Sequence, residues 1–264
     1  MPYETIIYEK DGGIATLTFN RPNVMNAANS QLTQETRDAM ADAMGDDAVR
    51  VLIITGAGRG FHAGDDVKEL FLRQDRDEHR TQEKLARIRG SSSTASGLPE
   101  MFKPTIAAVN GAAVGLGMDI ALLCDIRIAS ENAKFGYFYV RRGLIGTEIA
   151  PVRLIHQIGL SRALEMMLSG ELIDAQEAYK LGLVSRVVPP DNLTDEARAV
   201  ATKLMQGAPL AQQAIKRAVH RAMYDPASVS ELVSDLLSRL FETEDHIEGA
   251  RAFTEKRAPE YKGE

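Results

Sequence analysis

The alternation of apolar and polar positions divides the chain into short strands and longer helices. Apolar runs rich in β-branched residues predict strands at residues 6–8, 14–19, 51–55, 105–109, 126–129 and 183–188. The first two runs flank Asp11-Gly12-Gly13, a turn sequence that predicts a β-hairpin. The runs at 51–55 and 105–109 are apolar throughout and are expected to be buried.

Helices are predicted between these strands by a period of 3.6 residues or by capping residues. They are expected at residues 30–45, 71–89, 162–168 and 174–182. Ser161 is the expected N-cap of the third helix, and Asp174, with Glu177 three residues on, that of the fourth. The segment 71–89 is dense in charge, which predicts a solvated helix.

Glycine becomes scarce beyond residue 195, and three amphipathic helices are expected there. Their apolar stripes are Ala197, Val200, Ala201 and Leu204; Ala214, Ile215, Ala218, Val219 and Ala222; and Val229, Leu232, Val233, Leu236 and Leu240. Three such stripes are more than a monomer needs, so they are candidates for packing against a partner chain. We therefore divide the chain into a core over residues 1–195 and a helical region over 196–264.

Composition narrows the class of protein. The chain has 264 residues and a net charge of −6, so no basic surface suggests nucleic acid. The single cysteine, Cys124, permits no internal disulfide and favours a reducing compartment. The acidic N-terminal sequence has no signal-peptide pattern, and Asp119 interrupts the most apolar stretch, which argues against a membrane span. We expect a cytoplasmic protein.

The segment 103–125 carries the strongest chemical signal. A predicted strand is followed by Asn110-Gly111, by Gly115-Leu116-Gly117 and by an apolar helix start. Such a bend leaves backbone N–H groups unpaired, and the helix dipole adds partial positive charge, so an anion that develops during a reaction is stabilised there. Asp119 lies in the first turn, where it is either a catalytic carboxylate or a complement to the helix dipole.

A second unit of this kind covers residues 51–66. Its strand leads into a glycine-rich loop that ends at Gly64, and Asp66 with Glu69 has the spacing of a capping box. Two such units are able to direct two N–H donors at one oxygen, which is the minimum for an oxyanion hole.

These features together resemble the crotonase superfamily, the enoyl-CoA hydratases and isomerases. The resemblance covers nearly the whole chain in ordered spacing. It is carried by residues 20–22 (NRP), 26–27 (NA), 61–66 (FHAGDD), 103–111 (KPTIAAVNG), 115–119 (GLGMD), 124–125 (CD), 133–136 (AKFG), 182–184 (GLV) and 253–257 (FTEKR).

The resemblance implies an α/β fold, a spiral of ββα units with a C-terminal helical oligomerisation region, assembled as a homotrimer or homohexamer. It implies an acyl-CoA thioester substrate, with coenzyme A as part of that substrate, and no permanently bound cofactor or metal. The thioester oxygen would lie between the backbone N–H groups of Ala63 and Leu116. The adenine and phosphate end would lie near Ala27, Ala63, Asp65 and Val67, with Lys256, of the same or a neighbouring subunit, as a candidate phosphate contact.

The catalytic residues depart from the family pattern. Related hydratases use two glutamates; the first corresponds to Asp119 and the second to Tyr139, which is not a base at neutral pH. Glu148 lies one residue from the position where related isomerases and dehalogenases carry their single acid. Leu116 replaces the middle glycine of the usual triplet, so its side chain must find room. Each departure permits altered chemistry. The alternative to a catalytic role is that Tyr139 lines the pocket and that Glu148 is a solvated residue at a helix start.

Several functions remain open on the sequence. The leading hypothesis is an enzyme that stabilises a thioester enolate and moves a proton or water across a double bond. Decarboxylation or hydrolysis of a CoA ester is an alternative on the same scaffold, and Arg141 and Arg142, which otherwise read as surface charge, hint at a second carboxylate on the substrate. A non-catalytic acyl-CoA-binding relative is a third. A dinucleotide-dependent dehydrogenase is disfavoured because Phe61 stands where its third fingerprint glycine would be. His62 reads as a loop residue rather than a base.

Overall fold

The structure is a computed structural model that describes residues 3–66 and 97–264. The expected charged helix at 71–89 and Val67 lie outside these residues. In order along the chain, the described strands are β1 (Ile6–Asp11), β2 (Ile14–Phe19), β3 (Val51–Gly56), β4 (Gly60–His62), β5 (Thr105–Val109), β6 (Ala112–Val114), β7 (Ile126–Ser130), β8 (Lys134–Gly136), β9 (Leu172–Asp174) and β10 (Arg186–Val188).

The described α-helices are α1 (Ser30–Gly45), α4 (Gly97–Glu100), α5 (Leu116–Leu123), α6 (Ile149–Ile158), α7 (Leu160–Ser169), α8 (Ala175–Lys180), α9 (Leu193–Leu204), α10 (Pro209–Tyr224), α11 (Val229–Leu240) and α12 (Glu244–Glu255). Short 3₁₀ helices are η1 (Pro22–Val24), η3 (Phe138–Arg142), η4 (Pro190–Asn192) and η5 (Pro226–Ser228).

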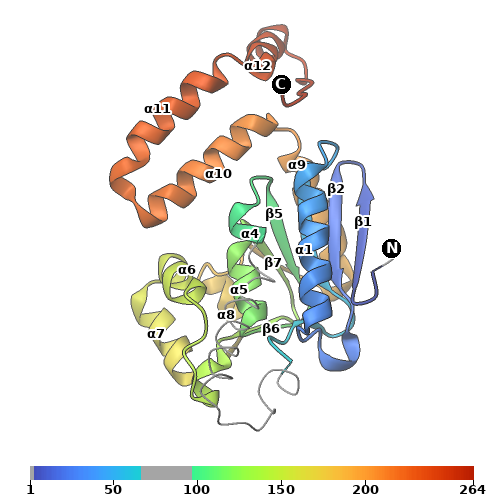
Figure 1. Ribbon diagram of the computed structural model, residues 1–264, viewed down its shortest axis with the longest axis vertical. Coiled ribbons are helices and arrows are strands. Elements are labelled where there is room, and N and C mark those ends of the chain that lie inside the picture. Colours follow the sequence, from blue (N-terminus) through green and yellow to red (C-terminus); the bar gives the residue numbers. More distant parts are fainter. Residues whose placement is uncertain (1–2, 67–96) are drawn as a thin grey trace.

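The described strands form two sheets that the chain visits in turn. One sheet has the order β1-β2-β3-β5-β7-β10 and is parallel except for the β1–β2 hairpin. The other has the order β4-β6-β8-β9. Each turn of the chain places one strand in the larger sheet and the next in the smaller, as in β3–β4, β5–β6 and β7–β8. This alternation between the two sheets is the spiral that the family resemblance implied (Figure 1).

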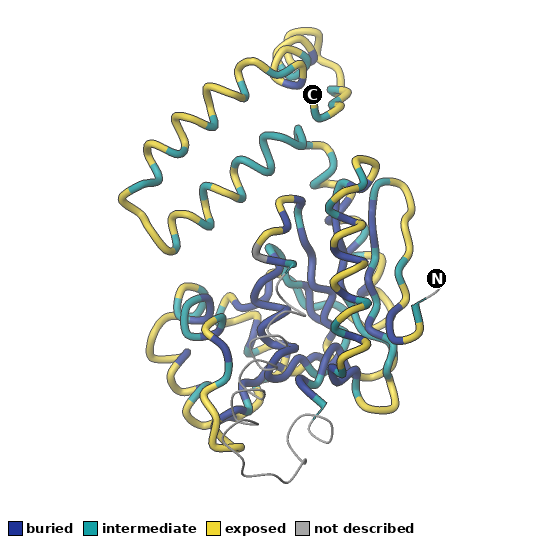
Figure 2. Tube along the Cα trace, viewed as in Figure 1, coloured by how far each residue is buried: buried dark blue, intermediate teal, exposed yellow. Residues whose placement is uncertain are grey.

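The larger sheet is covered on both faces, and its side chains alternate between two apolar clusters. In β3, Leu52 and Ile54 pack into the cluster that includes α1 and α5, whereas Val51 and Ile53 pack into the cluster that includes α9. The period of two residues along a strand causes this division. Figure 2 shows the buried residues concentrated around these strands and α5.

The C-terminal helices differ in burial. The first apolar stripe is covered within the chain, because Ala197, Val200 and Ala201 of α9 pack against the sheet. Helices α10 and α11 instead extend away from the sheets and contain no buried residue (Figures 1 and 2). Of the three predicted apolar stripes, those of α10 and α11 are therefore left for a partner chain. The division of the chain at residue 195 stays a prediction.

Two local expectations were wrong. Helix α7 begins at Leu160, with Gly159 rather than Ser161 at its N-cap, because Gly159 adopts a φ of +79° that ends α6. The last strand is also shorter than predicted. The N–H groups of Leu183 and Val184 both donate to Ala178 O at the end of α8, so pairing with β7 begins at Arg186. The Asp174 cap is confirmed, since its side chain accepts from Glu177 N.

Candidate active site

The start of α5 and the loop after β4 are packed directly against each other. A Cβ atom on Gly117 would lie 1.9 Å from His62 O, and a Cβ atom on Gly64 would lie 3.6 Å from Leu116 N. His62 and Gly64 are the two neighbours of Ala63 in the chain, so Ala63 faces the first turn of α5. The two glycine-rich units that the sequence indicated are therefore brought together.

The two predicted N–H donors differ in their partners. The first N–H group of α5 with a helical acceptor is that of Asp119, which donates to Gly115 O at 3.1 Å. The Leu116 N–H lies in the preceding turn and has no hydrogen-bond partner within residues 3–66 and 97–264. The Ala63 N–H donates to Met25 O at 3.0 Å, so the expectation that this donor is unpaired was wrong. The cause is the chain after β2, which runs alongside the loop and also bonds Ala28 N to Gly64 O.

The side chain of Leu116 is 1% exposed and belongs to the core cluster around α5. The core therefore accommodates the leucine that replaces the middle glycine. Gly115, at the N-cap, has a φ of +57°, and the ring of Tyr139 lies 3.6 Å from the position of its missing Cβ atom.

Asp119 is completely buried in the first turn of α5. The pKa of its carboxyl group is raised to about 8, mainly by burial and also by the charges of Asp65 and Glu148, while the hydrogen bond from Thr147 lowers it. Thr147 Oγ1 donates to Asp119 Oδ2 at 2.9 Å. A carboxyl group with this pKa exchanges its proton near neutral pH, which suits proton transfer and not only a complement to the helix dipole.

Tyr139 and Glu148 flank this carboxyl group differently. Tyr139 is 8% exposed, and burial together with Asp119 holds the pKa of its hydroxyl group well above its usual range, so it stays neutral. Glu148 is exposed at the N-cap of α6. It is next to Thr147 in the chain and near enough to affect the pKa of Asp119. Asp119 thus faces the interior, whereas Glu148 faces water.

His62 is not a base in this structure. It is buried at the end of β4, and burial lowers its pKa to about 3. Its Nδ1 atom accepts a hydrogen bond from Gly64 N at 3.1 Å. His62 is therefore a neutral core residue that shapes the loop before Ala63.

The structure describes some of the residues that were predicted to bind the CoA group. Ala27 and Asp65 lie close together, because Ala28, the neighbour of Ala27, pairs with Asp65 in an isolated bridge. Lys256, at the C-cap of α12, lies at the far end of the molecule from α5 (Figure 1). Within one chain it does not join the site, so the predicted contact depends on a neighbouring subunit.

Sequence reasoning missed Thr147, which donates to Asp119, and Tyr137 and Gly146, which pack together beside Thr147. The Tyr137 hydroxyl donates to Thr147 O at 3.1 Å and accepts from Thr147 N at 3.0 Å. A weak signal was present in the sequence, since Gly146 and Thr147 directly precede the candidate acid Glu148.

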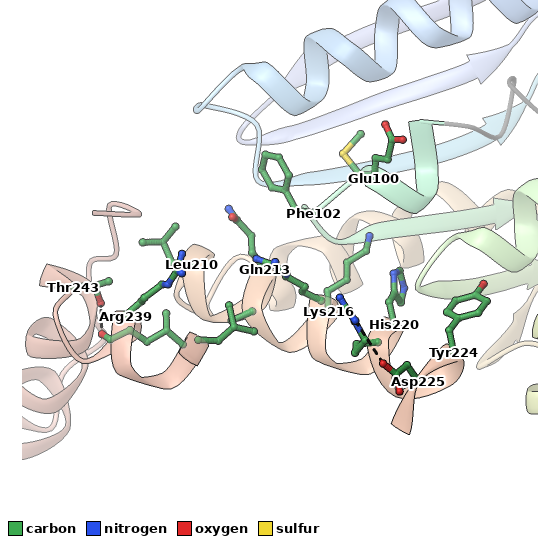
Figure 3. Close-up of a pocket in the computed structure, with 16 residues that line it drawn as sticks. Glu100, Phe102, Leu210, Gln213, Lys216, His220, Tyr224, Asp225, Arg239 and Thr243 are labelled. Carbon is green, nitrogen blue, oxygen red and sulfur yellow. Dashed lines mark hydrogen bonds and ion pairs between the residues drawn. The ribbon is translucent and has the colours of Figure 1, made fainter. Parts of the chain in front are cut away.

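A cavity of about 820 Å³ lies elsewhere, between α10, α11 and residues 100–102. In Figure 3, Lys216 and His220 extend from α10 toward the body of the protein. Lys216 Nζ reaches Asp125 Oδ2 at 2.8 Å. None of the predicted site residues lines this cavity. It is therefore separate from the acid site.

No group of three or more His, Cys, Asp or Glu side chains within residues 3–66 and 97–264 could hold a metal ion. In the same ranges, none of the helices combines the length and apolar character that crossing a bilayer requires.

The sequence profile of the enoyl-CoA hydratase/isomerase family matches residues 9–264. The chain belongs to this family. It is 39% identical to a probable enoyl-CoA hydratase of Mycobacterium tuberculosis over 99% of both chains. It is 40% identical to the (E)-benzylidenesuccinyl-CoA hydratase of Thauera aromatica, over 98% of this chain and 99% of that one. The crystal structure of an enoyl-CoA hydratase from Bacillus anthracis superposes with a TM-score of 0.91 at 31% identity, covering 99% of this chain and 100% of that one. These matches confirm the predicted family and fold of this enoyl-CoA hydratase/isomerase family member.

Proposed function

We propose that this family member hydrates the double bond of an enoyl-CoA thioester. The observation that carries the proposal is the buried carboxyl group of Asp119, whose pKa is raised to about 8. It lies one turn from the N–H of Leu116, which is unpaired among the residues that the structure describes. A proton donor beside an oxyanion site is what addition across a thioester-conjugated double bond requires.

The thioester oxygen is proposed to accept from Leu116 N–H and Ala63 N–H. Negative charge develops on this oxygen as the enolate forms, and the N-terminal dipole of α5 stabilises it. Because Ala63 N–H already donates to Met25 O, it shares its hydrogen between the two acceptors when the substrate is bound. The CoA end of the substrate is proposed to follow Ala27, Asp65 and Val67, with Lys256 of a neighbouring subunit near a phosphate.

Asp119 and Glu148 are proposed to divide the proton transfers. Glu148 is exposed and accepts a proton from water while the hydroxide part bonds to the β-carbon. The electron pair of the double bond moves toward the thioester, and the protonated Asp119 delivers its proton to the α-carbon. One water molecule is thereby added, and a proton returns from Glu148 to Asp119 through solvent. Tyr139 lines the pocket.

An acyl group with a second carboxylate is a specific candidate for the substrate. Arg142 is exposed and close enough to Tyr139 for its charge to lower the pKa of that residue. Arg141, in contrast, packs over the ring of Phe138. The Thauera aromatica relative is named for a succinyl-CoA derivative, which carries such a carboxylate. Arg142 is the proposed contact for it.

The experiment is incubation with a panel of saturated and unsaturated acyl-CoA esters, with and without a distal carboxylate, followed by mass spectrometry. A mass gain of one water supports hydration. An unchanged mass with shifted absorbance indicates isomerisation. Loss of carbon dioxide indicates decarboxylation, and release of free CoA indicates hydrolysis. Binding without any conversion indicates a non-catalytic relative and overturns the proposal.

We also propose that the chain forms trimers or hexamers in the cytoplasm. Support comes from α10, where Ile215 is 64% and Val219 55% exposed in a single chain. Apolar side chains at this spacing form one stripe that a partner is expected to cover.

A further inference from the structure

The hydroxyl group of Thr147 both accepts and donates a hydrogen bond. Its Oγ1 atom accepts from Ile149 N at 3.2 Å, at the start of α6, and donates to Asp119 Oδ2 at 2.9 Å. A backbone N–H can only donate, and Asp119 Oδ2 is the one acceptor that the Thr147 hydroxyl hydrogen meets among the described residues, so this hydrogen is directed at Asp119. The start of α6 thereby helps to orient the Thr147 hydroxyl group toward Asp119.

The main chain of Thr147 is held by a buried phenol. The hydroxyl group of Tyr137, which is 1% exposed, bonds to both Thr147 N and Thr147 O. The preceding residue, Gly146, has a φ of +84°, and a Cβ atom there would lie 2.4 Å from the Tyr137 oxygen. Only glycine lets the turn approach the phenol this closely. Thr147 is thus fixed through its backbone as well as through its side chain.

The two carboxyl oxygens of Asp119 are consequently unequal. Oδ2 accepts from Thr147, whereas Oδ1 is buried and has no hydrogen-bond partner among the residues that the structure describes. A carboxylic acid places its proton on the oxygen that is not already accepting a hydrogen bond. We propose that Thr147 is a positioning residue that keeps the transferable proton of Asp119 on Oδ1, and that Tyr137 holds Thr147 in the required place.

The other groups around Asp119 do not duplicate this role. Asp65, in the loop after β4, and Glu148, at the start of α6, act on its pKa by repulsion. Tyr137 and Tyr139 are neutral phenols whose own pKa values are raised by burial and by Asp119. His62, which packs against the same turn of α5, has a lowered pKa and stays uncharged. Among these described neighbours, Thr147 is the one side chain that forms a hydrogen bond with the Asp119 carboxylate.

The inference rests on the proposed hydration for its catalytic meaning, so its test uses a property that does not need turnover. The carboxyl group of Asp119 is titrated by infrared difference spectroscopy in the protein without substrate, with ¹³C-labelled aspartate and Asp119→Asn to identify its band. Thr147→Val removes the hydroxyl group at nearly constant shape. Thr147→Ser keeps the hydroxyl group and is the matched control.

The expected result is a pKa of Asp119 that rises by about one unit in Thr147→Val, because a hydrogen bond to the charged form is lost. Thr147→Ser is expected to keep the wild-type pKa. In kinetics, the alkaline limb of kcat/KM moves to higher pH by the same amount in Thr147→Val, and turnover at pH 7 falls about tenfold or more. Thr147→Ser is expected to restore both.

A pKa of Asp119 that is the same in Thr147→Val as in the wild type would overturn the inference, as would a Thr147→Ser variant that behaves like Thr147→Val. If Thr147→Val does not fold, Tyr137→Phe serves instead, since it frees the main chain of Thr147 but keeps its hydroxyl group. It is expected to raise the pKa of Asp119 by a smaller amount, and no change there contradicts the proposal. Failure of the hydration itself would appear separately, as a wild-type protein that converts no enoyl-CoA.

Discussion

The carbonyl oxygen of His62 occupies the space where a side chain of Gly117 would be, 1.9 Å from its ideal Cβ position. This contact joins the end of β4 to the first turn of α5, and Ala63 and Leu116 face each other because of it. The distance between the two proposed oxyanion donors is therefore set by the absence of one methyl group.

Gly117→Ala is expected to disrupt the site. A Cβ atom cannot lie 1.9 Å from a backbone oxygen, so β4 and α5 must separate, and we expect a loss of stability of about 1–3 kcal/mol, as for other overpacked interiors. Gly45→Ala is the control, because a Cβ atom at Gly45, near the end of α1, meets nothing within 4 Å. Chemical denaturation measures both; equal stabilities would contradict the close contact.

Leu116→Pro is expected to remove one oxyanion donor and leave the fold intact. Leu116 is the first residue of α5, where proline is tolerated and its missing N–H has no helical acceptor. Turnover should fall about a hundred- to a thousandfold, as when one such donor is removed from other enzymes. Leu116→Ala loses a buried side chain but keeps the N–H. If both variants lose the same rate, packing rather than the donor explains the effect.

Asp119→Asn and Glu148→Gln are each expected to lower turnover by at least about a hundredfold with little change in CoA affinity. The amide groups keep the shape of the side chains but transfer no proton. Turnover and CoA binding are measured separately for each variant. Wild-type rates in Glu148→Gln together with an inactive Asp119→Asn would identify a one-acid enzyme and favour isomerisation. Full activity in both variants would show that the site is wrong.

Asp119→Asn is also expected to stabilise the protein in a pH-dependent manner. Since burial raises the pKa of Asp119 to about 8, the folded protein keeps a proton that the unfolded chain releases near pH 4. Stability of the wild type should therefore fall as the pH rises from about 4 to 8 and change little from this group above that. Asparagine has no such dependence.

The thermal midpoint of Asp119→Asn is accordingly expected to exceed that of the wild type by at least about 2–4 °C at pH 9, the effect of 1 kcal/mol in a domain of this size. At pH 5 the difference should be much smaller. A constant difference between pH 5 and pH 9 would argue against a raised pKa.

Sedimentation of the purified protein at micromolar concentration is expected to show trimers or hexamers. The double variant Ile215→Glu/Val219→Glu places charges on the exposed stripe of α10 and should lower the observed mass. Lys180→Glu, an exposed charge change in α8, is the control and should leave the mass unchanged. A monomeric wild type would refute the proposed assembly.

The sequence by itself determined the features that depend on neighbouring residues. A period of two residues identified the strands, Asp11-Gly12-Gly13 the hairpin, and Asp174 a helix start, because side-chain direction and capping are local properties. The family pattern added Asp119, and the glycine-rich loop before α5 indicated the N–H group of Leu116; the same expectation failed at Ala63, whose N–H donates to Met25 O.

Only the tertiary structure decided which of these groups meet. Thr147 and Asp119 are 28 positions apart, and their hydrogen bond exists because Tyr137 and the start of α6 hold the loop over α5. The Ala63 N–H is occupied because the chain after β2 returns alongside it, and the stripe of α9 is buried because a sheet face lies opposite. Periodicity gives the direction of a side chain from its own element, but its partner, its burial and its pKa depend on what the other elements place in front of it.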